Sequence, residues 1–122
     1  MDKELTPTAK CFLVATMELA RRKKIASTEG LIKILRGEED EETLSLRDMI
    51  GFASCLSLKA KRGKMLLHSL VLNRLLDQKF IEGDYFLALN DLGQKIALES
   101  EEKVKTLSFK TKKTKPATIR DI

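Results

Sequence analysis

Four basic side chains lie at the start of the longest apolar segment of the chain, with no acid among them. Lys59, Lys61, Arg62 and Lys64 belong to the stretch LSLKAKRGKMLLHSLVL, residues 56–72. A helix N-terminus already carries partial positive charge and unpaired N–H groups, so cations there oppose the helix dipole. The same side chains and N–H groups can together bind a phosphate. The alternative is that the cations are only solvated, at a cost of about 0.3–1 kcal/mol each at most.

Charge is segregated along the chain. The net charge is +5, yet residues 49–76 contain five Lys or Arg and no acid, and residues 103–122 contain seven basic residues and one acid. Segregation of this kind indicates a polyanionic partner. The basic tail is interpreted as an extra phosphate contact or, in a eukaryotic host, a nuclear import signal, with a solubilising disordered end as the alternative.

The acidic block EEDEE, residues 38–42, also has two interpretations. A solvated loop is the simpler one. The other is a surface that mimics DNA or binds a basic partner. If this block folded over the basic helix, it would compete with DNA from within the same chain.

The sequence shows no constellation for catalysis or metal binding. Cys11 and Cys55 lie far apart, with His68 as the single histidine, so zinc-ligand spacing is missing and two buried, reduced thiols are expected. His68 stands among leucines and is expected to be packed or at the rim of the core. Asp48 and Asp77 lack the spacing of an acid and base pair. We therefore expect no enzyme activity, no cofactor and no metal.

The composition is typical of one soluble globular domain. Hydrophobic residues make up 43% of the chain and charged residues 34%, and no apolar run is long enough to span a bilayer. The N-terminal MDKELTP is polar and acidic, unlike a secretory signal. We expect an intracellular monomer, nuclear if the host is eukaryotic and otherwise cytoplasmic, at the nucleoid.

Apolar periodicity and capping residues predict several helices with one small hairpin. Thr6 before Pro7 is a typical N-cap, Ser27 and Thr28 both offer caps for the helix that follows, and Gly37 is a typical helix stop. The predicted elements are, in chain order, helices over residues 7–21, 29–36, 46–51 and 58–78, a tight hairpin around Gly83 and Asp84, a helix capped by Asn90 or Asp91, and a strand over residues 103–110. The helix over residues 58–78 is apolar on most sides and is expected to pack centrally. The prediction is one domain over residues 1–110 and a basic disordered tail over residues 111–122.

This order of elements is that of a winged helix-turn-helix domain, mostly α with a small β-hairpin. Duplex nucleic acid is the common ligand of such domains, although winged helices also serve as protein-interaction modules. Two alternatives to a DNA-binding module therefore stand. One is an adaptor in a repair or replication assembly. The other is a dimeric transcriptional regulator, which needs a self-complementary apolar patch, for example on the first helix.

Three segments of the chain follow one another at a recognisable spacing: LIKILRG (residues 31–37), IGFAS (50–54) and MLLHSLVLNRLLDQKFIEGDYFLALNDLGQKIALES (65–100). Together they resemble the RQC domain that follows the helicase core in RecQ-family DNA helicases. The resemblance extends over residues 31–109. Its most specific pieces are Leu35-Arg36-Gly37, the spacing of Leu66, Leu70 and Leu75 before Phe80, and LALNDLGQKIAL, which is similar to the family's LxLTxxGxxvL signature.

The resemblance implies binding of duplex and branched DNA in repair or replication. It implies phosphate contacts around the second and central helices, and a hairpin near the point of strand separation. Arg36 matches the arginine of the family's RG motif, and Lys59, Lys61 and Arg62 occupy the region of its basic segment. The helicase motor and the zinc-binding segment that precede the domain in the family are not in this sequence, so this chain alone is not expected to hydrolyse ATP.

The chain departs from the family at two places. Acids from Glu38 onward follow the RG motif, where the family has polar or basic residues. In the turn before the basic segment, Gly51 fits the first glycine of the family pattern, while Ala53 or Ser54 replaces the second. These departures concern the contact geometry around both predicted phosphate sites.

Tyr85 is the aromatic residue close to the predicted hairpin tip. It is a candidate wing contact that could stack on a base pair, with packing inside the hairpin as the alternative. The complete candidate nucleic-acid-binding set is Arg36, Lys59, Lys61, Arg62, Lys64 and Tyr85. Because phosphate contacts position a protein without reading bases, the expected binding is structure-selective or weakly dependent on sequence.

Overall fold

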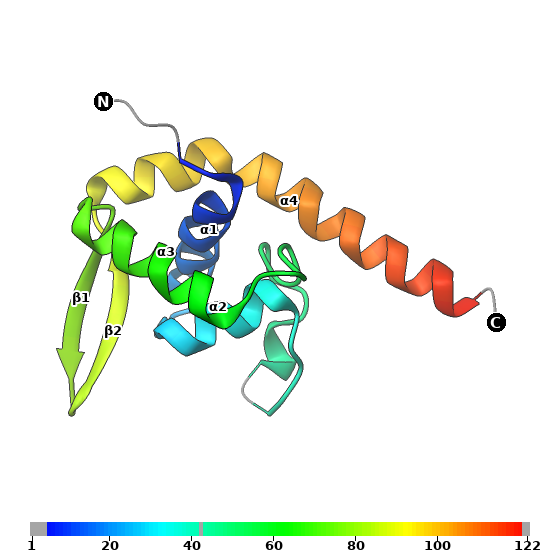
Figure 1. Ribbon diagram of the computed structural model, residues 1–122, viewed down its shortest axis with the longest axis horizontal. Helices are drawn as coiled ribbons and strands as arrows, with labels where there is room; N and C mark the ends of the chain where they lie inside the picture. The colour runs from blue at the N-terminus through cyan, green and yellow to red at the C-terminus, as the bar shows by residue number, and fades with distance from the viewer. Residues whose placement is uncertain (1–4, 42, 121–122) are drawn as a thin grey trace.

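The computed structural model describes residues 5–41 and 43–120, with side chains as far as residue 107. This part of the chain forms four α-helices and one two-stranded antiparallel hairpin (Figure 1). The order is α1 (Pro7–Arg21), α2 (Thr28–Arg36), α3 (Ala60–Leu72), β1 (Leu76–Ile81), β2 (Asp84–Leu89) and α4 (Asp91–Arg120), with a 3₁₀ turn over Leu44–Leu46. The predicted class, mostly helical with a small hairpin, is confirmed.

The helix at the centre of the fold is α1. Every residue from 11 to 17 is at most 2% exposed, and α1 packs against α2, α3, α4 and β2. The prediction that the helix after residue 58 packs centrally is therefore wrong. Both helices are rich in apolar residues, but only α1 is apolar around its whole circumference in its middle turns. Because these turns are buried, they offer no apolar patch for a dimer.

The ends of α1 and α2 follow their predicted caps. The N–H of Ala9 donates to Thr6 Oγ1 (3.1 Å), and the N–H of Gly30 donates to Ser27 Oγ (3.0 Å). Gly37 ends α2 in the left-handed conformation, with φ of 75°. A short polar side chain thus starts both helices, and a glycine ends α2, through bonds between residues close in the sequence.

Helix α3 is shorter than predicted and lies on the surface. It ends at Leu72 because Arg74 adopts a left-handed φ of 63°, so that the N–H of Leu75 returns to the carbonyl of Leu70 (2.9 Å). This turn carries no glycine or proline, which is why the sequence did not reveal the stop. Leu75 and Leu76 are then buried as the chain enters β1.

The hairpin pairs β1 with β2 from Leu76 opposite Leu89 to Ile81 opposite Asp84. Its two central turn residues are Glu82 and Gly83, both with positive φ, so the predicted hairpin is confirmed with its turn one residue earlier. Figure 1 shows the hairpin projecting away from the helices. Its base is held by Leu87, whose N–H donates to the carbonyl of Ala26 (2.7 Å) in the segment between α1 and α2.

The segment between α2 and α3 is irregular. An α-helix predicted over residues 46–51 is replaced by the 3₁₀ turn Leu44–Leu46 and a series of tight turns. Ser45 makes no capping bond; Thr43 organises the segment instead, since it is buried and its hydroxyl donates to the carbonyl of Glu38 (2.6 Å). Met49 and Phe52 bury their side chains and fix these turns against the core.

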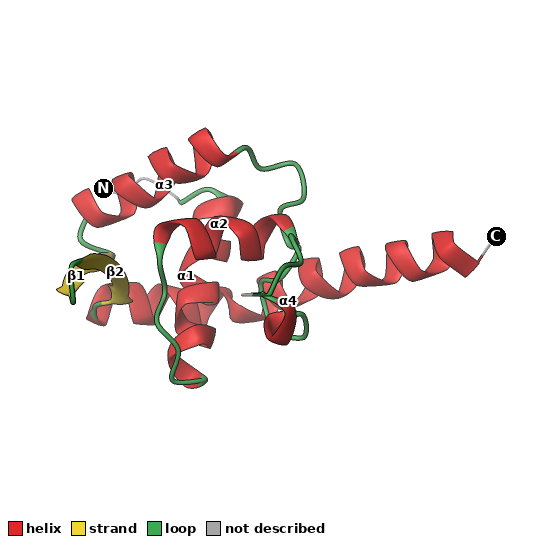
Figure 2. Ribbon diagram, turned by 90° about the horizontal axis from the view of Figure 1, so that it is seen from below, coloured by secondary structure: helices red, strands yellow, loops and turns green. Residues whose placement is uncertain are grey.

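Helix α4 runs along α1 and then continues past the rest of the fold (Figure 2). Its buried face is formed by small residues and valine at helical spacing: Gly93, Ala97, Ser100 and Val104. The predicted strand over residues 103–110 is therefore wrong, and the backbone of residues 111–120 is helical where a disordered tail was predicted. The division of the chain at residue 110 stays a prediction. Within the described residues, no helix is both long and apolar enough to cross a membrane.

The first turn of α4 is fixed by the residues that follow α3. Asn90 caps the helix, as predicted, by accepting the N–H of Gly93 through Oδ1 (2.9 Å), and its amide donates to the carbonyl of Arg74. Gly93 itself lies against the carbonyl oxygen of Leu75, so that a Cβ at this position would overlap a backbone atom. The glycine of the LALNDLGQKIAL segment is thus a packing requirement.

We expect Gly93→Ala to destabilise the fold. The added Cβ would meet the Leu75 carbonyl oxygen, which cannot rotate away, and overpacking of this kind lowers the free energy of unfolding by about 1–3 kcal/mol. Chemical denaturation measures the change. Gln94→Ala, at the exposed neighbouring position, is the control and should shift it by less than about 0.5 kcal/mol. Equal stability of the two variants would contradict this packing.

Candidate nucleic-acid interface

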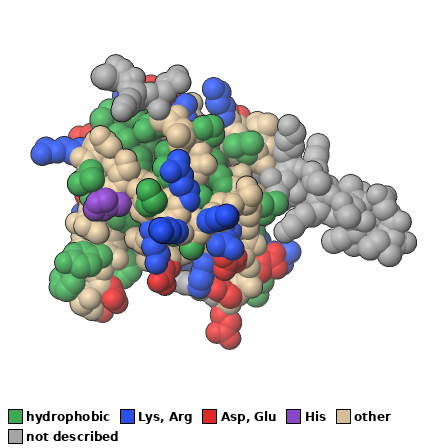
Figure 3. All heavy atoms as spheres, in the orientation of Figure 1, with side chains coloured by type: hydrophobic (Ala, Val, Ile, Leu, Met, Phe, Trp, Pro, Cys, Tyr) green, Lys and Arg blue, Asp and Glu red, His purple; other side chains and the backbone are tan. Residues whose placement is uncertain are grey.

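Four exposed cations surround the start of α3. Lys59, Lys61, Arg62 and Lys64 are all solvent-exposed, and within the described residues none of them forms an ion pair. We call these four residues the basic surface. Figure 3 shows Lys and Arg side chains gathered on the face of the molecule that α3 occupies. The structure thus brings together four of the six predicted contacts.

The N-terminus of α3 has no side-chain cap. Lys59 is the N-cap residue, and its extended backbone starts the helix without a capping hydrogen bond from its side chain. The first helical bond runs from the N–H of Gly63 to the carbonyl of Lys59 (2.9 Å), so the N–H groups of the three residues before Gly63 have no partner inside the helix. Free N–H groups and cations therefore occur together in the first two turns of α3, a combination that can bind phosphate.

Helix α3 is seated on α2 through a glycine. A Cβ at Gly63 would approach the side chain of Ile32 to 2.9 Å, so the two helices are in close contact here. The buried side of α3 is completed by Leu67 and Leu70. Its outer side carries the basic surface, the exposed His68 and two exposed apolar side chains, Met65 and Leu72.

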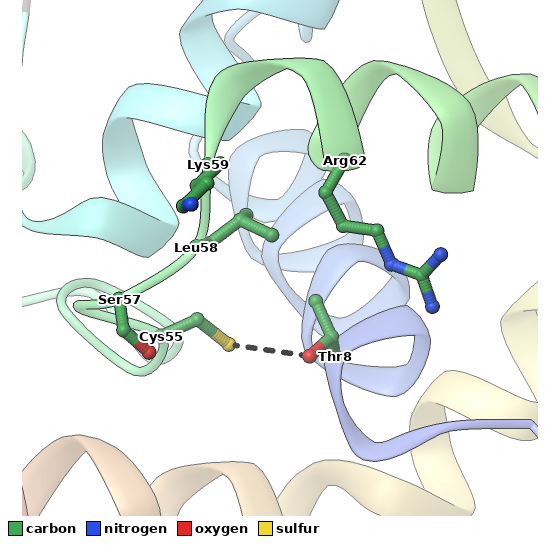
Figure 4. A pocket seen from close by; sticks show the side chains of 6 residues that line it. All are labelled: Thr8, Cys55, Ser57, Leu58, Lys59 and Arg62. Atoms are coloured by element: carbon green, nitrogen blue, oxygen red, sulfur yellow. Dashed lines mark hydrogen bonds between the residues drawn. The ribbon is translucent and has the colours of Figure 1, made fainter.

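An open pocket of about 440 Å³ lies beside the basic surface. It is lined by residues from α1, the α2–α3 segment and the start of α3: Thr8, Cys55, Ser57, Leu58, Lys59 and Arg62 (Figure 4). Lys59 and Arg62 therefore give this pocket a positive rim. Sequence reasoning did not find it, because Thr8 and Cys55 come together only in the folded chain.

Arg36 is not part of the basic surface. Its Nε lies 3.0 Å from Glu38 Oε2, so the acid that departs from the family pattern neutralises the arginine of the RG motif. The side chain of Arg36 remains about one-third exposed at 36%. A phosphate at this site would have to compete with Glu38.

The acidic block folds onto α2. Besides the Glu38 contact, Asp40 pairs with Lys33 (2.9 Å) and Glu39 pairs with Arg47 (3.2 Å). The described acids are exposed, as a solvated loop predicts, but they are ordered by ion pairs and by Thr43. Residue 42 lies outside the described residues. No described acid of the block pairs with the basic surface, so nothing here supports the hypothesis that it competes with DNA at α3.

The contacts of Asp40 with Lys33 and Thr43 lower the pKa of its carboxyl group. The hydrogen bond from Lys33 Nζ is the largest cause, and the N–H of Thr43 adds to it, so the pKa of Asp40 falls from 3.8 to about 2. Both donors favour the charged carboxylate. The acidic loop is therefore held on α2 across the physiological pH range.

Tyr85 lies near the tip of the hairpin and is 62% exposed. It stands opposite Phe80 in the register, with ring centroids 4.9 Å apart and an interplanar angle of 57°. Tyr85 therefore packs against Phe80 within the hairpin and at the same time exposes its ring to solvent. Phe80 and Ile81 are also exposed. We call Phe80, Ile81 and Tyr85 the wing tip.

The turn before α3 adopts a conformation that favours glycine at two positions. Gly51 has φ of 102° and Ala53 has φ of 61°, so Ala53 and not Ser54 occupies the second left-handed position. The turn is fixed to the last turn of α2, because the N–H of Ala53 donates to Ile34 and that of Cys55 donates to Leu35, both at 2.8 Å. These bonds set the direction in which the chain enters α3.

The remaining predicted side chains have ordinary environments. His68 is exposed on α3, at the rim as expected, and Asp77 is exposed on β1. Asp48 lies 3.2 Å from Arg22, in an ion pair that joins the α2–α3 segment to the end of α1. Cys11 is buried as expected, whereas Cys55 is only half-buried and lines the pocket; both are free thiols.

Comparisons of the chain with protein-family models, curated proteins and solved structures found no match. The resemblance to the RQC domain therefore stays a prediction from the residues that carry it.

We expect the Asp40 carboxylate to titrate near pH 2. Since its pKa is lower in the folded than in the unfolded chain, its stabilising effect is complete above the unfolded-state value of about 3.9 and is lost as the pH falls toward about 2. The side-chain carboxyl carbon shift in NMR spectra measures the titration. Lys33→Met should raise this pKa, whereas Lys24→Met, at an exposed lysine elsewhere, should not. An Asp40 pKa that is the same in both variants would contradict the Lys33 contact.

Proposed function

We propose that this chain is a non-catalytic DNA-binding module with a winged helix-turn-helix arrangement, which binds duplex or branched DNA through its phosphates. The observation that carries the proposal is the basic surface at the uncapped start of α3. Four exposed cations without acidic partners in the described chain, next to free helix N–H groups, form a site for a polyanion.

The arrangement of α2, α3 and the hairpin supports this proposal. Helix α3 packs on α2 through Gly63 and leaves its other side exposed, as a recognition helix requires. The hairpin follows α3 directly and presents the wing tip to solvent. The resemblance to the RQC domain suggests a role in DNA repair or replication and assigns Tyr85 as the wing contact.

Binding of this kind is electrostatic and steeply dependent on salt. Each neutralised phosphate contributes a slope of about −0.9 to the plot of log binding constant against log salt concentration. The contacts carry little base information, so affinity should follow DNA shape more than DNA sequence. Arg36 would contact DNA only when its ion pair with Glu38 is broken.

We expect the double variant Lys61→Ala/Arg62→Ala to bind duplex, forked and single-stranded DNA roughly 10-fold more weakly at low salt, a loss of about 1.4 kcal/mol. Its salt slope should be smaller by about 1 for each lost contact. Fluorescence anisotropy with the three labelled DNAs across a salt series measures both quantities and ranks the preferred DNA structure.

The control for this experiment is Lys95→Ala/Lys103→Ala, which removes the same charge from exposed positions of α4. It should change affinity and slope much less. Equal losses in the two double variants would remove α3 from the interface. A wild-type chain that binds none of the three DNAs at low salt would refute the proposed function.

We expect Glu38→Gln to tighten DNA binding by roughly two- to fivefold at low salt, because it releases Arg36 from its ion pair. The gain should fade at high salt. Glu99→Gln, an exposed position on α4, has the same change in net charge and serves as the control. An identical gain in both variants, in the same anisotropy assay, would show that Arg36 makes no phosphate contact.

A protein-interaction module is the second candidate, and exposed apolar side chains at the end of α3 and on the hairpin favour it. Leu72 is 68% exposed at the end of α3, and the wing tip is exposed on the adjoining hairpin. Apolar side chains that gather on a surface are typical of protein contacts. Under this alternative, Phe80→Ser would abolish partner binding while the basic surface could be neutralised without effect.

A further inference from the structure

The outer edge of β1 is unpaired. Within the described residues the sheet has two strands, so β1 pairs with β2 on one side only. The outer edge of β2 is used near its base, where the N–H of Leu87 donates to the carbonyl of Ala26 (2.7 Å). No backbone bond of this kind lies on the outer side of β1 in the described part of the chain. Figure 1 shows β1 at the margin of the molecule, and an exposed strand edge is a template for another strand.

The pairing within the hairpin determines which backbone groups of β1 face outward. The two-residue turn makes Ile81 and Asp84 a hydrogen-bonded pair, and such pairs alternate along an antiparallel ladder. Every second residue of β1 therefore turns its N–H and carbonyl away from β2. The outward bond of Leu87 to Ala26 follows the same alternation on β2. Three residues of β1 have outward backbone groups: Leu76, Gln78 and Phe80.

A second copy of β1 can bind this edge symmetrically. Homodimers commonly have a two-fold axis, which pairs a strand antiparallel with itself. With the axis at Gln78, Gln78 lies opposite its own copy and Leu76 lies opposite Phe80, so all three outward residues are paired. Moving the axis to residue 77 or 79 leaves one of the three without a partner in the other strand. The backbone thus favours a single register.

The charges of β1 favour the same register. With the axis at Gln78, Asp77 lies opposite Lys79 of the second copy, and symmetry produces this pair twice. Both side chains are exposed, and neither forms an ion pair within the described residues. An axis at residue 77 or 79 would place like charges opposite each other, which destabilises a strand pair. The strand is therefore complementary to itself in charge as well as in its backbone.

The apolar side chains of the hairpin suit this arrangement. Leu76 and Phe80 lie on the same face of β1, yet Leu76 is 1% exposed at the base of the hairpin and Phe80 is 62% exposed at its tip. Antiparallel pairing places the tip of one copy beside the base of the other. Phe80 would therefore pack beside Leu76 of the second copy, where the apolar face of the hairpin joins the core. This contact would cover part of the wing tip.

We propose that a second copy of this chain is the partner of β1, and that the two copies form a continuous four-stranded antiparallel sheet with its two-fold axis at Gln78. The strand order is β2–β1–β1–β2. The interface is small, so the dimer is weak and depends on protein concentration. This inference goes beyond DNA binding, and it gives the hairpin the self-complementary surface that a dimeric regulator requires.

Sedimentation velocity of the full chain without DNA tests the association, at protein concentrations up to about 1 mM because small interfaces are weak. The wild-type sedimentation coefficient should rise with concentration toward that of a dimer. Asp77→Lys places lysines opposite Lys79 and should weaken dimerisation roughly 10-fold or more. The exchange variant Asp77→Lys/Lys79→Asp restores opposite charges and should restore the dimer. Glu99→Lys, at an exposed position of α4, makes the same charge change as Asp77→Lys and should have much less effect.

Disulfide trapping tests the position of the axis. In a Cys55→Ala background, Gln78→Cys should form a covalent dimer under mild oxidation, because Cα atoms in a hydrogen-bonded pair are about 5.5 Å apart, within the range of a disulfide. Gln94→Cys, at an exposed position of α4, is the control and should form much less.

Three results would overturn the proposal. The first is a wild-type chain that stays monomeric at every concentration, as the sequence predicts. The second is an exchange variant that dimerises no better than Asp77→Lys, and the third is equal trapping of the Gln78→Cys and Gln94→Cys variants. All of these measurements are made without DNA, so their outcome is independent of the proposed function.

Discussion

The burial of α1 is the constraint on which the positions of the other elements depend. Its middle turns, residues 11–17, are covered on all sides, and α2, α3, α4 and β2 all pack against it. A helix that is apolar around its whole circumference has to be enclosed. Since α1 occupies the centre, α3 can bury only one side, and its other side faces solvent together with the hairpin that follows.

Because one side of α3 is exposed, the cations at its start lie on the surface. The cations at the start of α3 have no acidic partner among the described residues, whereas the acidic block is paired with Lys33, Arg36 and Arg47 around α2. The acids and bases around α2, which are close in the sequence, therefore neutralise one another, whereas the cations at the start of α3 do not form such pairs within the described residues. Within the described residues, the cations at the start of α3 thus form a basic region beside the pocket that Cys55 lines.

Structural features that depend on neighbouring residues could be predicted from the sequence, and features that depend on tertiary packing could not. Thr6 and Gly37 fix helix ends through side-chain and backbone bonds within a few residues, so the ends of α1 and α2 followed from the residue types alone. Arg74 ends α3 in a left-handed conformation that nothing in its side chain announces. The cations of the basic surface were identified, but the exposure of Phe80 depends on how distant segments pack. Packing likewise decides which of the two apolar helices, α1 or α3, is enclosed.

The most direct test of the central claim is an NMR titration of the isotope-labelled full chain with unlabelled duplex DNA at low salt. If α3 presents the binding surface, the backbone amide signals of residues 57–65 should shift most, with smaller shifts at the wing tip. These shifts should diminish as salt is added, because the contacts are to phosphates. Shifts confined to α4, or no shifts at saturating DNA, would contradict a phosphate-binding surface at the start of α3.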